Sequence, residues 1–115
     1  MKVLLGTTGI KVDKNGFGAL PVQRVSFNEA IKLLGMAFDG GIEFFDTARF
    51  YTDSEEKLGA AFKEKRHQIV IASKTMAKTV ADFWKDLENS LKNLGTDYID
   101  VYQFHNPNYC TKPGD

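Results

Sequence analysis

Short apolar segments alternate with longer amphipathic ones along this chain, and that alternation constrains the fold more than any other feature. Strand candidates lie near residues 15–19 and at residues 42–45, 69–72 and 98–103. Between them, apolar residues recur at helical spacing over segments of about 10 to 15 residues. Strands separated by helices of this length predict a parallel sheet with right-handed crossovers. The expected fold class is therefore α/β.

Capping signals bound the helices that we expect between these strands. Ser26 with Glu29 forms a capping box, and Thr79 can accept the backbone N–H of Asp82 in the same way. The expected helices run from Ser26 to the Gly40-Gly41 pair, from Asp53 or Ser54 to Lys65, and from Thr79 to Gly95. Their apolar stripes predict packing against the sheet. The stripes consist of Phe27, Ala30, Ile31, Leu34, Ala37 and Phe38 in the first helix and Phe83, Leu87, Leu91 and Leu94 in the third.

The amino-terminal 25 residues differ from the rest because glycines punctuate them. Gly6, Gly9, Gly16 and Gly18 stand among short apolar pairs, a pattern typical of a small β-hairpin ahead of the first strand. With 115 residues, 43% of them hydrophobic and 26% charged, the composition is that of one globular domain. We expect a single domain over residues 1–115.

Charge and cysteine content exclude several classes of partner and site. Fifteen basic residues balance fifteen acidic ones without long blocks of either sign, so neither a nucleic-acid nor an anionic-membrane footprint is expected. No segment approaches the roughly 18 apolar residues of a membrane span. Cys110 is the only cysteine, which is most simply a loop thiol and leaves no cysteine-rich metal site. We expect no metal and a reducing, cytoplasmic setting.

Polar side chains follow the ends of three predicted strands. Asp46 follows two phenylalanines, Lys74 closes an apolar strand, His105 follows Phe104, and Tyr51 lies in the loop beyond Asp46. Taken singly, these could be a turn former, a solvated cation, a core histidine and one aromatic among several. Together they lie where ligands of parallel βα folds bind, because the carboxyl ends of the strands open onto one face. We expect all three ionisable groups to be substantially buried, and Asp46 to pair with Lys74.

The sequence around these residues resembles the signature blocks of the aldo-keto reductase family, over nearly the whole chain. The Tyr-x-x-Ser-Glu spacing from Tyr51 to Glu55 is similar to that of the bacterial branch of the family. The blocks are Gly41-Ile42-Glu43-Phe44-Phe45-Asp46-Thr47-Ala48, Tyr51, Ser54-Glu55-Glu56-Lys57-Leu58-Gly59, Ile71-Ala72-Ser73-Lys74 and Tyr102-Gln103-Phe104-His105-Asn106-Pro107.

This resemblance implies parallel βα units of a TIM (β/α)8 barrel, preceded by a β-hairpin, and the reduction of aldehydes or ketones. It assigns Asp46, Tyr51, Lys74 and His105 as catalytic residues. Tyr51 would protonate the developing alkoxide, and the Lys74 cation, held by Asp46, would favour ionisation of the phenol. His105 would hydrogen-bond the substrate oxygen.

The resemblance also implies a nicotinamide cofactor and a small-molecule carbonyl substrate. NADPH is the expected cofactor, with NADH as the alternative. Gly18 and Ala19, at the end of the first barrel strand, are expected beside the nicotinamide together with Asp46.

Length separates this chain from a complete barrel, which has eight strands and about 250 residues. The sequence supplies four barrel strands, about the first half of the fold. An open half would expose two sheet edges and the face meant for the barrel interior. We therefore expect self-association or a missing carboxyl-terminal half, and the tail at Pro113-Gly114-Asp115 suggests truncation. The alternative function is a catalytically silent oligomeric or regulatory module, as in the potassium-channel β subunits that share the family's fold.

Overall fold

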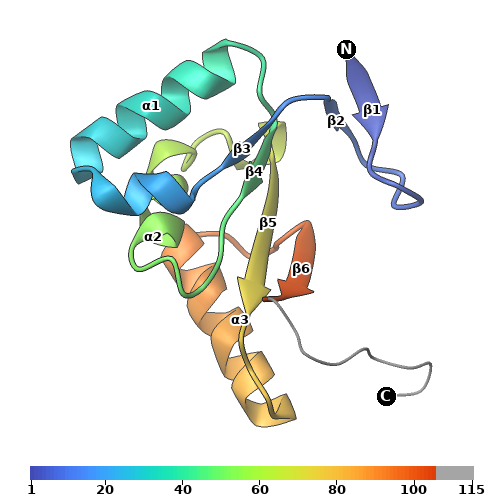
Figure 1. Cartoon of the computed structure of the whole chain (residues 1–115), viewed down its shortest axis with the longest axis vertical. Helices are drawn as coiled ribbons and strands as arrows, with labels where there is room; N and C mark the ends of the chain where they lie inside the picture. The colour runs from blue at the N-terminus through green and yellow to red at the C-terminus, as the bar shows by residue number, and fades with distance from the viewer. Residues whose placement is uncertain (106–115) are drawn as a thin grey trace.

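The computed structural model describes residues 1–105, and Figure 1 shows a sheet with helices packed beside it. The elements in chain order are β1 (Lys2–Leu4), β2 (Lys11–Asp13), β3 (Gly16–Gly18), η1 (Leu20–Arg24), α1 (Phe27–Asp39), β4 (Phe44–Asp46), α2 (Ser54–Ala61), η2 (Arg66–Gln68), β5 (Val70–Thr75), α3 (Val80–Leu94) and β6 (Val101–Phe104). Strands β1 and β2 form an antiparallel hairpin, and β3, β4, β5 and β6 form a parallel sheet in that order. The expected hairpin and parallel βα units are confirmed.

Strand register sorts the side chains onto two faces of the sheet. Phe17, Phe45 and Ile71 are in register across β3, β4 and β5. Asp46, one residue further along β4, pairs with Ala72. Because successive side chains of a strand point to opposite faces, Asp46 and Lys74 share the face opposite Phe45. This alternation separates the polar groups from the helix-packed core.

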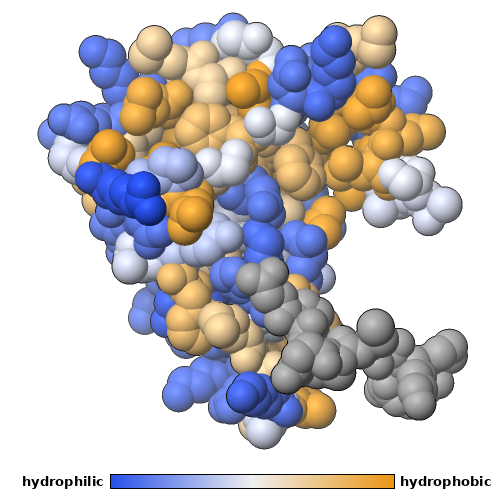
Figure 2. Space-filling view, viewed as in Figure 1, coloured by the Kyte–Doolittle hydropathy of each residue, from blue (hydrophilic) through white to orange (hydrophobic). Residues whose placement is uncertain are grey.

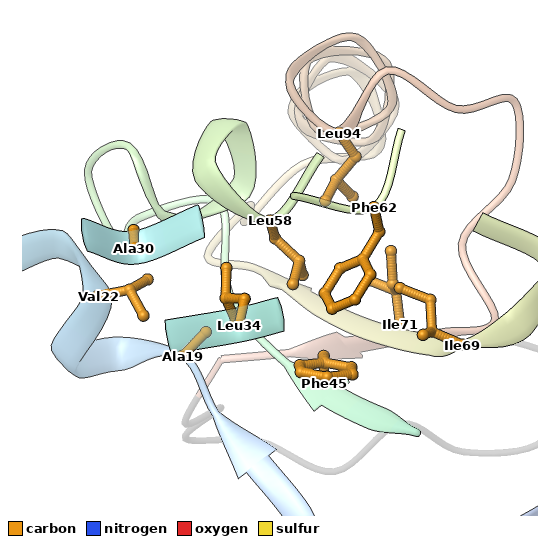
Figure 3. Close-up of a cluster of buried hydrophobic side chains, with 10 residues drawn as sticks. All are labelled: Ala19, Val22, Ala30, Leu34, Phe45, Leu58, Phe62, Ile69, Ile71 and Leu94. Atoms are coloured by element: carbon orange, nitrogen blue, oxygen red, sulfur yellow. The ribbon is translucent and has the colours of Figure 1, made fainter. Parts of the chain in front are cut away.

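The hydrophobic core lies between the sheet and its helices, as Figure 3 shows. Phe45 of β4 is completely buried, and its ring centroid lies 4.7 Å from that of Phe62 and 5.7 Å from that of Phe17. The cluster also contains Ala19, Val22, Ala30, Leu34, Leu58, Ile69, Ile71 and Leu94. Burial of a large apolar side chain is worth about 1.5–3 kcal/mol. The core therefore holds β4 and β5 rigidly against α1 and α2, with their polar carboxyl ends beyond it.

Helix ends follow the capping signals in the sequence. The Ser26 hydroxyl accepts a hydrogen bond from the backbone N–H of Glu29 at 3.2 Å, and the Thr79 hydroxyl accepts one from Asp82 at 3.1 Å. Gly95 ends α3 in the left-handed conformation at φ 65°. Backbone bonds from Gly95 and Thr96 back into the last turn close it, which is the Schellman arrangement. The predicted beginnings of both helices and the predicted end of α3 are confirmed.

Some predicted boundaries are wrong by a few residues. The second helix, expected to reach Lys65, ends at Ala61. Phe62 turns into the core there, and the exposed residues 63–65 form turns instead of a further helical turn. Strand β5, expected over residues 69–72, extends to Thr75, because its pairing with β6 continues as far as Thr75 opposite Phe104.

The helix stripes are buried less completely than the periodicity predicts. In α3 only Leu94 of the expected stripe is fully buried, and Phe27 at the start of α1 is exposed. Helix α3 packs at the β5–β6 edge of a four-stranded sheet, so part of its apolar side has no neighbouring element among the described residues. The expected burial of Phe83, Leu87 and Leu91 is therefore only partial.

The β1–β2 hairpin stands apart from the sheet, at the upper right of Figure 1. Met1, Val3 and Leu4 are exposed on it, and Figure 2 shows the apolar surface in that region. An ion pair of 3.1 Å between Lys2 and Glu43 ties the hairpin to the chain just before β4. None of the helices within residues 1–105 has the length and apolar character needed to cross a bilayer. Cys110 and the tail at 113–115 lie outside the described residues.

Candidate active site

The carboxyl ends of β4 and β5 bring Asp46 and Lys74 together. Lys74 Nζ donates to Asp46 Oδ1 at 2.8 Å and to the backbone carbonyl of Thr47 at 2.8 Å. The expected pairing of the two side chains is therefore present. Lys74 is 15% exposed and Asp46 is 36% exposed. The expectation of substantial burial is wrong for Asp46, because its side chain opens onto the face of the sheet that no helix covers.

Backbone pairing explains why the two side chains meet. Asp46 lies opposite Ala72 in the β4–β5 ladder, and Lys74 is the next residue of β5 on the same face. Beyond the end of β4, the Thr47 N–H donates to the Ala72 carbonyl at 2.8 Å, and the Arg49 N–H donates to the Lys74 carbonyl at 3.1 Å. The loop after β4 thus continues alongside β5, which fixes its position relative to Lys74.

Tyr51 is held in the same loop by local turns. Its N–H donates to the Ala48 carbonyl at 3.1 Å, and its own carbonyl accepts from the N–H of Ser54, the first residue of α2, at 2.8 Å. The next residue, Thr52, has a φ of 41°, which non-glycine residues seldom adopt. The Thr52 hydroxyl donates to Gln23 Oε1 at 3.0 Å and anchors this strained turn to η1.

The aromatic ring of Tyr51 lies close to both Lys74 and His105. Lys74 Nζ is 5.4 Å from the centroid of the Tyr51 ring. The His105 ring meets it edge to face, with centroids 5.5 Å apart and an interplanar angle of 89°. The His105 N–H donates to the Thr75 carbonyl at 2.8 Å, which places this residue directly past the end of β6. Asp46, Tyr51, Lys74 and His105 therefore form one cluster.

Two residues of this cluster have hydrogen-bonding groups without a partner among residues 1–105. A lysine ammonium has three N–H donors, and two of those of Lys74 are engaged, by Asp46 and Thr47. The imidazole Nδ1 of His105 is buried and has no partner among residues 1–105. A hydroxyl, a partly satisfied ammonium and an imidazole in contact can move a proton to a bound oxygen and hold that oxygen by hydrogen bonds.

The two residues expected beside a nicotinamide differ in accessibility. Gly18 is exposed, and a Cβ added to it would meet nothing within 4 Å. Ala19 is completely buried, and its N–H donates to the Asp46 carbonyl at 2.8 Å. Gly18 therefore leaves open space next to Asp46, its partner in the β3–β4 ladder. The methyl group of Ala19 faces the core and can only shape this end of the strand.

Sequence reasoning missed a buried polar brace behind the cluster. Glu55 of α2 is only 2% exposed. Its carboxylate accepts hydrogen bonds from the Ser73 hydroxyl at 2.7 Å and from Asn93 Nδ2 at 3.3 Å. These bonds tie α2, β5 and α3 together immediately beneath Lys74. Glu55 follows Ser54 in one of the signature blocks, which was the available signal for a role in the fold.

Arg49 was also missed, although it lies between Asp46 and Tyr51. It lines a pocket of about 440 Å³ with Phe50 and Met76 at the carboxyl end of the sheet. Another pocket, of about 660 Å³, lies between Arg66 and Tyr98 at the amino ends of β5 and β6. Ligands of parallel βα folds bind at carboxyl ends. The pocket beside Arg49 lies at that end of the sheet, although none of the four cluster residues lines it.

Sequence comparison places these features in a family. Residues 2–113 match the sequence model of the Aldo/keto reductase family. The chain is 35% identical to the aldo-keto reductase YhdN of Bacillus subtilis (strain 168), over 90% of this chain and 37% of that protein. It thus spans little more than a third of the length of this curated relative.

Solved structures agree with the sequence comparison. A putative aldo-keto reductase from Pseudomonas aeruginosa, PA4992, superposes with a TM-score of 0.83 at 34% identity, over 94% of this chain and 48% of that one. An aldo-keto reductase from Klebsiella pneumoniae in complex with NADPH gives a TM-score of 0.75 at 31% identity, over 83% of this chain and 36% of that one. The expected fold, about half of a TIM barrel preceded by a hairpin, is confirmed, and the chain belongs to the aldo/keto reductase family.

Proposed function

We propose that this chain carries the proton-donating part of an NAD(P)H-dependent reductase of small aldehydes and ketones. The observation that supports the proposal most is the contact cluster at the carboxyl ends of the strands. Lys74 Nζ bonds Asp46 at 2.8 Å and lies 5.4 Å from the Tyr51 ring centroid, and the His105 ring meets that ring edge to face. The family membership supplies the reaction class.

In this proposal Tyr51 donates the proton that the carbonyl oxygen takes up as it becomes an alcohol. The positive charge of Lys74 favours the phenolate that remains, and its unengaged N–H can bond the phenolic oxygen. Asp46 accepts a hydrogen bond from Lys74 at 2.8 Å and holds it in place. His105 donates a hydrogen bond to the carbonyl oxygen and orients it, so that negative charge developing there is stabilised.

The residues of this chain fit the edge of a nicotinamide site. A nicotinamide cofactor, when bound, supplies the hydride for the carbonyl carbon. Gly18 offers open backbone for a flat ring beside Asp46, whereas buried Ala19 supports the strand end from behind. We propose NADPH rather than NADH, by analogy with the solved relative that carries NADPH. A cytoplasmic setting belongs to the same proposal.

The sheet also suggests what the active protein requires. Among the described residues, β3 and β6 are the outer strands of the parallel sheet, and Gln103 of β6 is exposed. Outer strands of a sheet readily add further strands. We propose that a second copy of this chain, or further chain absent from the sequence, pairs with these strands and completes the cofactor site. Size-exclusion chromatography with light scattering tests this, and a compact monomer would contradict it.

The reductase proposal is tested by cofactor binding and turnover. The 115-residue chain is titrated with NADPH while nicotinamide fluorescence is followed, and 4-nitrobenzaldehyde is then added while NADPH absorbance is recorded. Because this chain holds only part of the cofactor site, we expect weak binding and at most slow aldehyde-dependent oxidation, which Tyr51→Phe should abolish without loss of binding. Saturable binding without any oxidation would favour the silent regulatory alternative. Absence of binding, even at high concentration, would remove the reductase proposal for this chain by itself.

A further inference from the structure

A contact between two buried hydroxyls closes the loop of residues 47–54, which carries Tyr51. Thr47 lies directly after β4 and Ser54 is the first residue of α2, and their side-chain oxygens are 2.7 Å apart. Both residues are completely buried. Ser54 Oγ also donates to the Ala19 carbonyl at 3.2 Å. Because a serine hydroxyl has a single O–H donor, Ser54 accepts the bond from Thr47. We call Thr47 and Ser54 the hydroxyl pair.

The Ser54 hydroxyl serves the loop rather than the helix that it begins. Serine at the start of a helix commonly caps the free backbone N–H groups there. The N-cap residue of α2 is Asp53, whose carboxylate pairs with Lys57, and the Ser54 hydroxyl is turned toward Thr47. The Ser54 N–H meanwhile donates to the Tyr51 carbonyl at 2.8 Å. Ser54 thus holds Tyr51 by its backbone and the opposite end of the loop by its side chain.

Thr47 connects the hydroxyl pair to Lys74. Its carbonyl accepts from Lys74 Nζ at 2.8 Å, and its N–H donates to the Ala72 carbonyl at 2.8 Å. The backbone of Thr47 is therefore held by β5, while its hydroxyl holds Ser54. As a result, the Lys74 ammonium and the end of the loop next to Tyr51 are both fixed relative to this one residue.

The backbone of Thr52 makes the loop depend on such contacts. Its φ of 41° is unusual for a β-branched residue, and conformations of this kind persist only where the surrounding structure holds them. Gln23 binds the Thr52 hydroxyl, and the hydroxyl pair fixes Ser54 two residues further on. Release of Ser54 would let Thr52 relax to a negative φ, which would turn the Tyr51 ring away from the cluster.

We propose that Thr47 and Ser54 are positioning residues, whose hydroxyl bond holds the Tyr51 ring in contact with Lys74 and His105. This inference rests on the proposed reductase function for the role of Tyr51 as proton donor. The buried hydroxyls act through the loop and not on a ligand. A displacement of a reacting group by about 1 Å can cost about 100-fold in rate, so a bond behind the site controls turnover.

The contact between the Tyr51 and His105 rings tests the proposal without turnover. The ring centroids are 5.5 Å apart, so NMR of the 115-residue chain should show nuclear Overhauser effects between them. Thr47→Val keeps the shape of the side chain and removes the hydroxyl, and we expect it to lose these signals. Thr47→Ser keeps the hydroxyl and loses a methyl group, and it should retain them. A role in packing alone predicts the reverse order.

Two further measurements keep the test independent of how the variants fold. In the wild type, the Thr47 hydroxyl proton should exchange slowly with water and show a nuclear Overhauser effect to Ser54, and a rapidly exchanging proton would overturn the inference. Ser90→Ala is the matched control, because Ser90 of α3 is also completely buried but its hydroxyl has no partner among residues 1–105. It should retain the ring contact.

Steady-state kinetics of an assembled, active form connect the hydroxyl pair to the reaction. Thr47→Val and Ser54→Ala should lower kcat about 10- to 100-fold with nearly unchanged NADPH affinity. Thr47→Ser should restore most of this loss, and Ser90→Ala should react like the wild type.

Each remaining outcome has its own meaning. A folded Thr47→Val or Ser54→Ala variant that keeps the ring contact would overturn the positioning role. Loss of the ring contact without a fall in kcat would overturn it as well. A ring contact that depends on the Thr47 hydroxyl, together with no turnover in any form of the protein, would refute the reductase proposal alone.

Discussion

Two lysines of this chain pair with aspartates at almost the same distance but in different surroundings. Lys57 Nζ lies 2.9 Å from Asp53 Oδ1 and also donates to the carbonyls of Val22 at 2.9 Å and Val25 at 2.7 Å. All three of its donors are therefore used, and its side chain is 2% exposed. Lys74 lies 2.8 Å from Asp46 and is 15% exposed, and only one other acceptor engages it.

The difference separates a structural cation from one available for chemistry. Lys57 ties α2 to η1 and to Val25 directly after it, and it has no donor left for a ligand. Lys74 holds the loop after β4 with two bonds and keeps a third donor beside the Tyr51 ring. The two lysines therefore differ in how many of their donors are satisfied, whereas their ion-pair distances are almost the same. Four substitutions test this distinction, from the largest expected effect to the smallest.

Tyr51→Phe tests whether the free donor of Lys74 serves a proton donor. Loss of a general acid typically costs about 10²–10⁴-fold in rate, and we expect a drop of that size in kcat for carbonyl reduction, with nearly unchanged NADPH affinity. The measurement is steady-state NADPH oxidation in an assembled, active form of the protein. Tyr98→Phe, at the amino end of β6, should leave kcat unchanged. Near-normal turnover in Tyr51→Phe would remove this residue from the acid role.

Lys57→Met should reduce stability more than any other change to these two pairs. The carbonyls of Val22 and Val25 would lose their donor, and an unsatisfied buried group costs about 1–3 kcal/mol. We expect a loss of about 2–4 kcal/mol in the free energy of unfolding, measured by urea denaturation. Lys63→Met, at an exposed position after α2, is the matched control and should unfold like the wild type. A loss no greater than that of the control would make Lys57 dispensable.

Lys74→Met should show the reverse balance between stability and activity. The Thr47 carbonyl and Asp46 each lose a donor. Asp46 is 36% exposed and can be solvated instead, so we expect a stability loss of about 1–2 kcal/mol. Carbonyl reduction should nevertheless fall steeply, because Tyr51 would lose its neighbouring cation. Urea denaturation and NADPH oxidation on the same preparation check both parts. Stability losses of equal size in Lys57→Met and Lys74→Met would break the comparison.

The Asp53–Lys57 pair should leave a small acid-dependent signature. The hydrogen bond from Lys57 is the main cause that holds the pKa of Asp53 below its ordinary value, which is about 3.9 in model peptides. Because the folded-state pKa is lower than the unfolded one, the stabilisation is complete above the unfolded value and is lost as the pH falls through the folded one. Asp53 is 41% exposed, so screening by solvent keeps the effect small.

Asp53→Asn should therefore flatten the pH dependence of stability below about pH 4. Urea midpoints of wild type and variant, compared at neutral pH and at successively lower pH, measure the difference. The two proteins should differ near neutrality and converge in acid. Asp97→Asn, which changes an exposed carboxylate after α3, should follow the wild type throughout. A constant difference at every pH would show that Asp53 acts without its charge.

Much of the fold could be predicted from local sequence signals. Ser26 and Thr79 begin their helices because their hydroxyls accept backbone N–H groups three residues on, and Gly95 ends α3 because it tolerates a positive φ. These interactions lie within a few residues of each other, so the pattern contains both partners. The end of α2 was mispredicted because Phe62 packs against Phe45, a contact that no local pattern encodes.

The candidate site also has features that the sequence predicts and features that it does not. Alternating strands and helices place Asp46, Lys74 and His105 at strand ends, and the resemblance to the aldo-keto reductases adds Tyr51. The sequence by itself thus determined the family, the parallel architecture and which polar side chains meet. Their roles as catalytic groups stay predictions.

Only the tertiary structure decided which polar groups are satisfied. Lys57 is saturated by Asp53 and by two carbonyls 32 and 35 residues away in the sequence. Among residues 1–105 the Arg49 guanidinium has no partner, whereas that of Arg66 has three. Hydrogen bonding depends on distance and angle between groups that folding brings together. Residue type and spacing indicate which donors are present, whereas the packed chain determines which of them are left for a ligand.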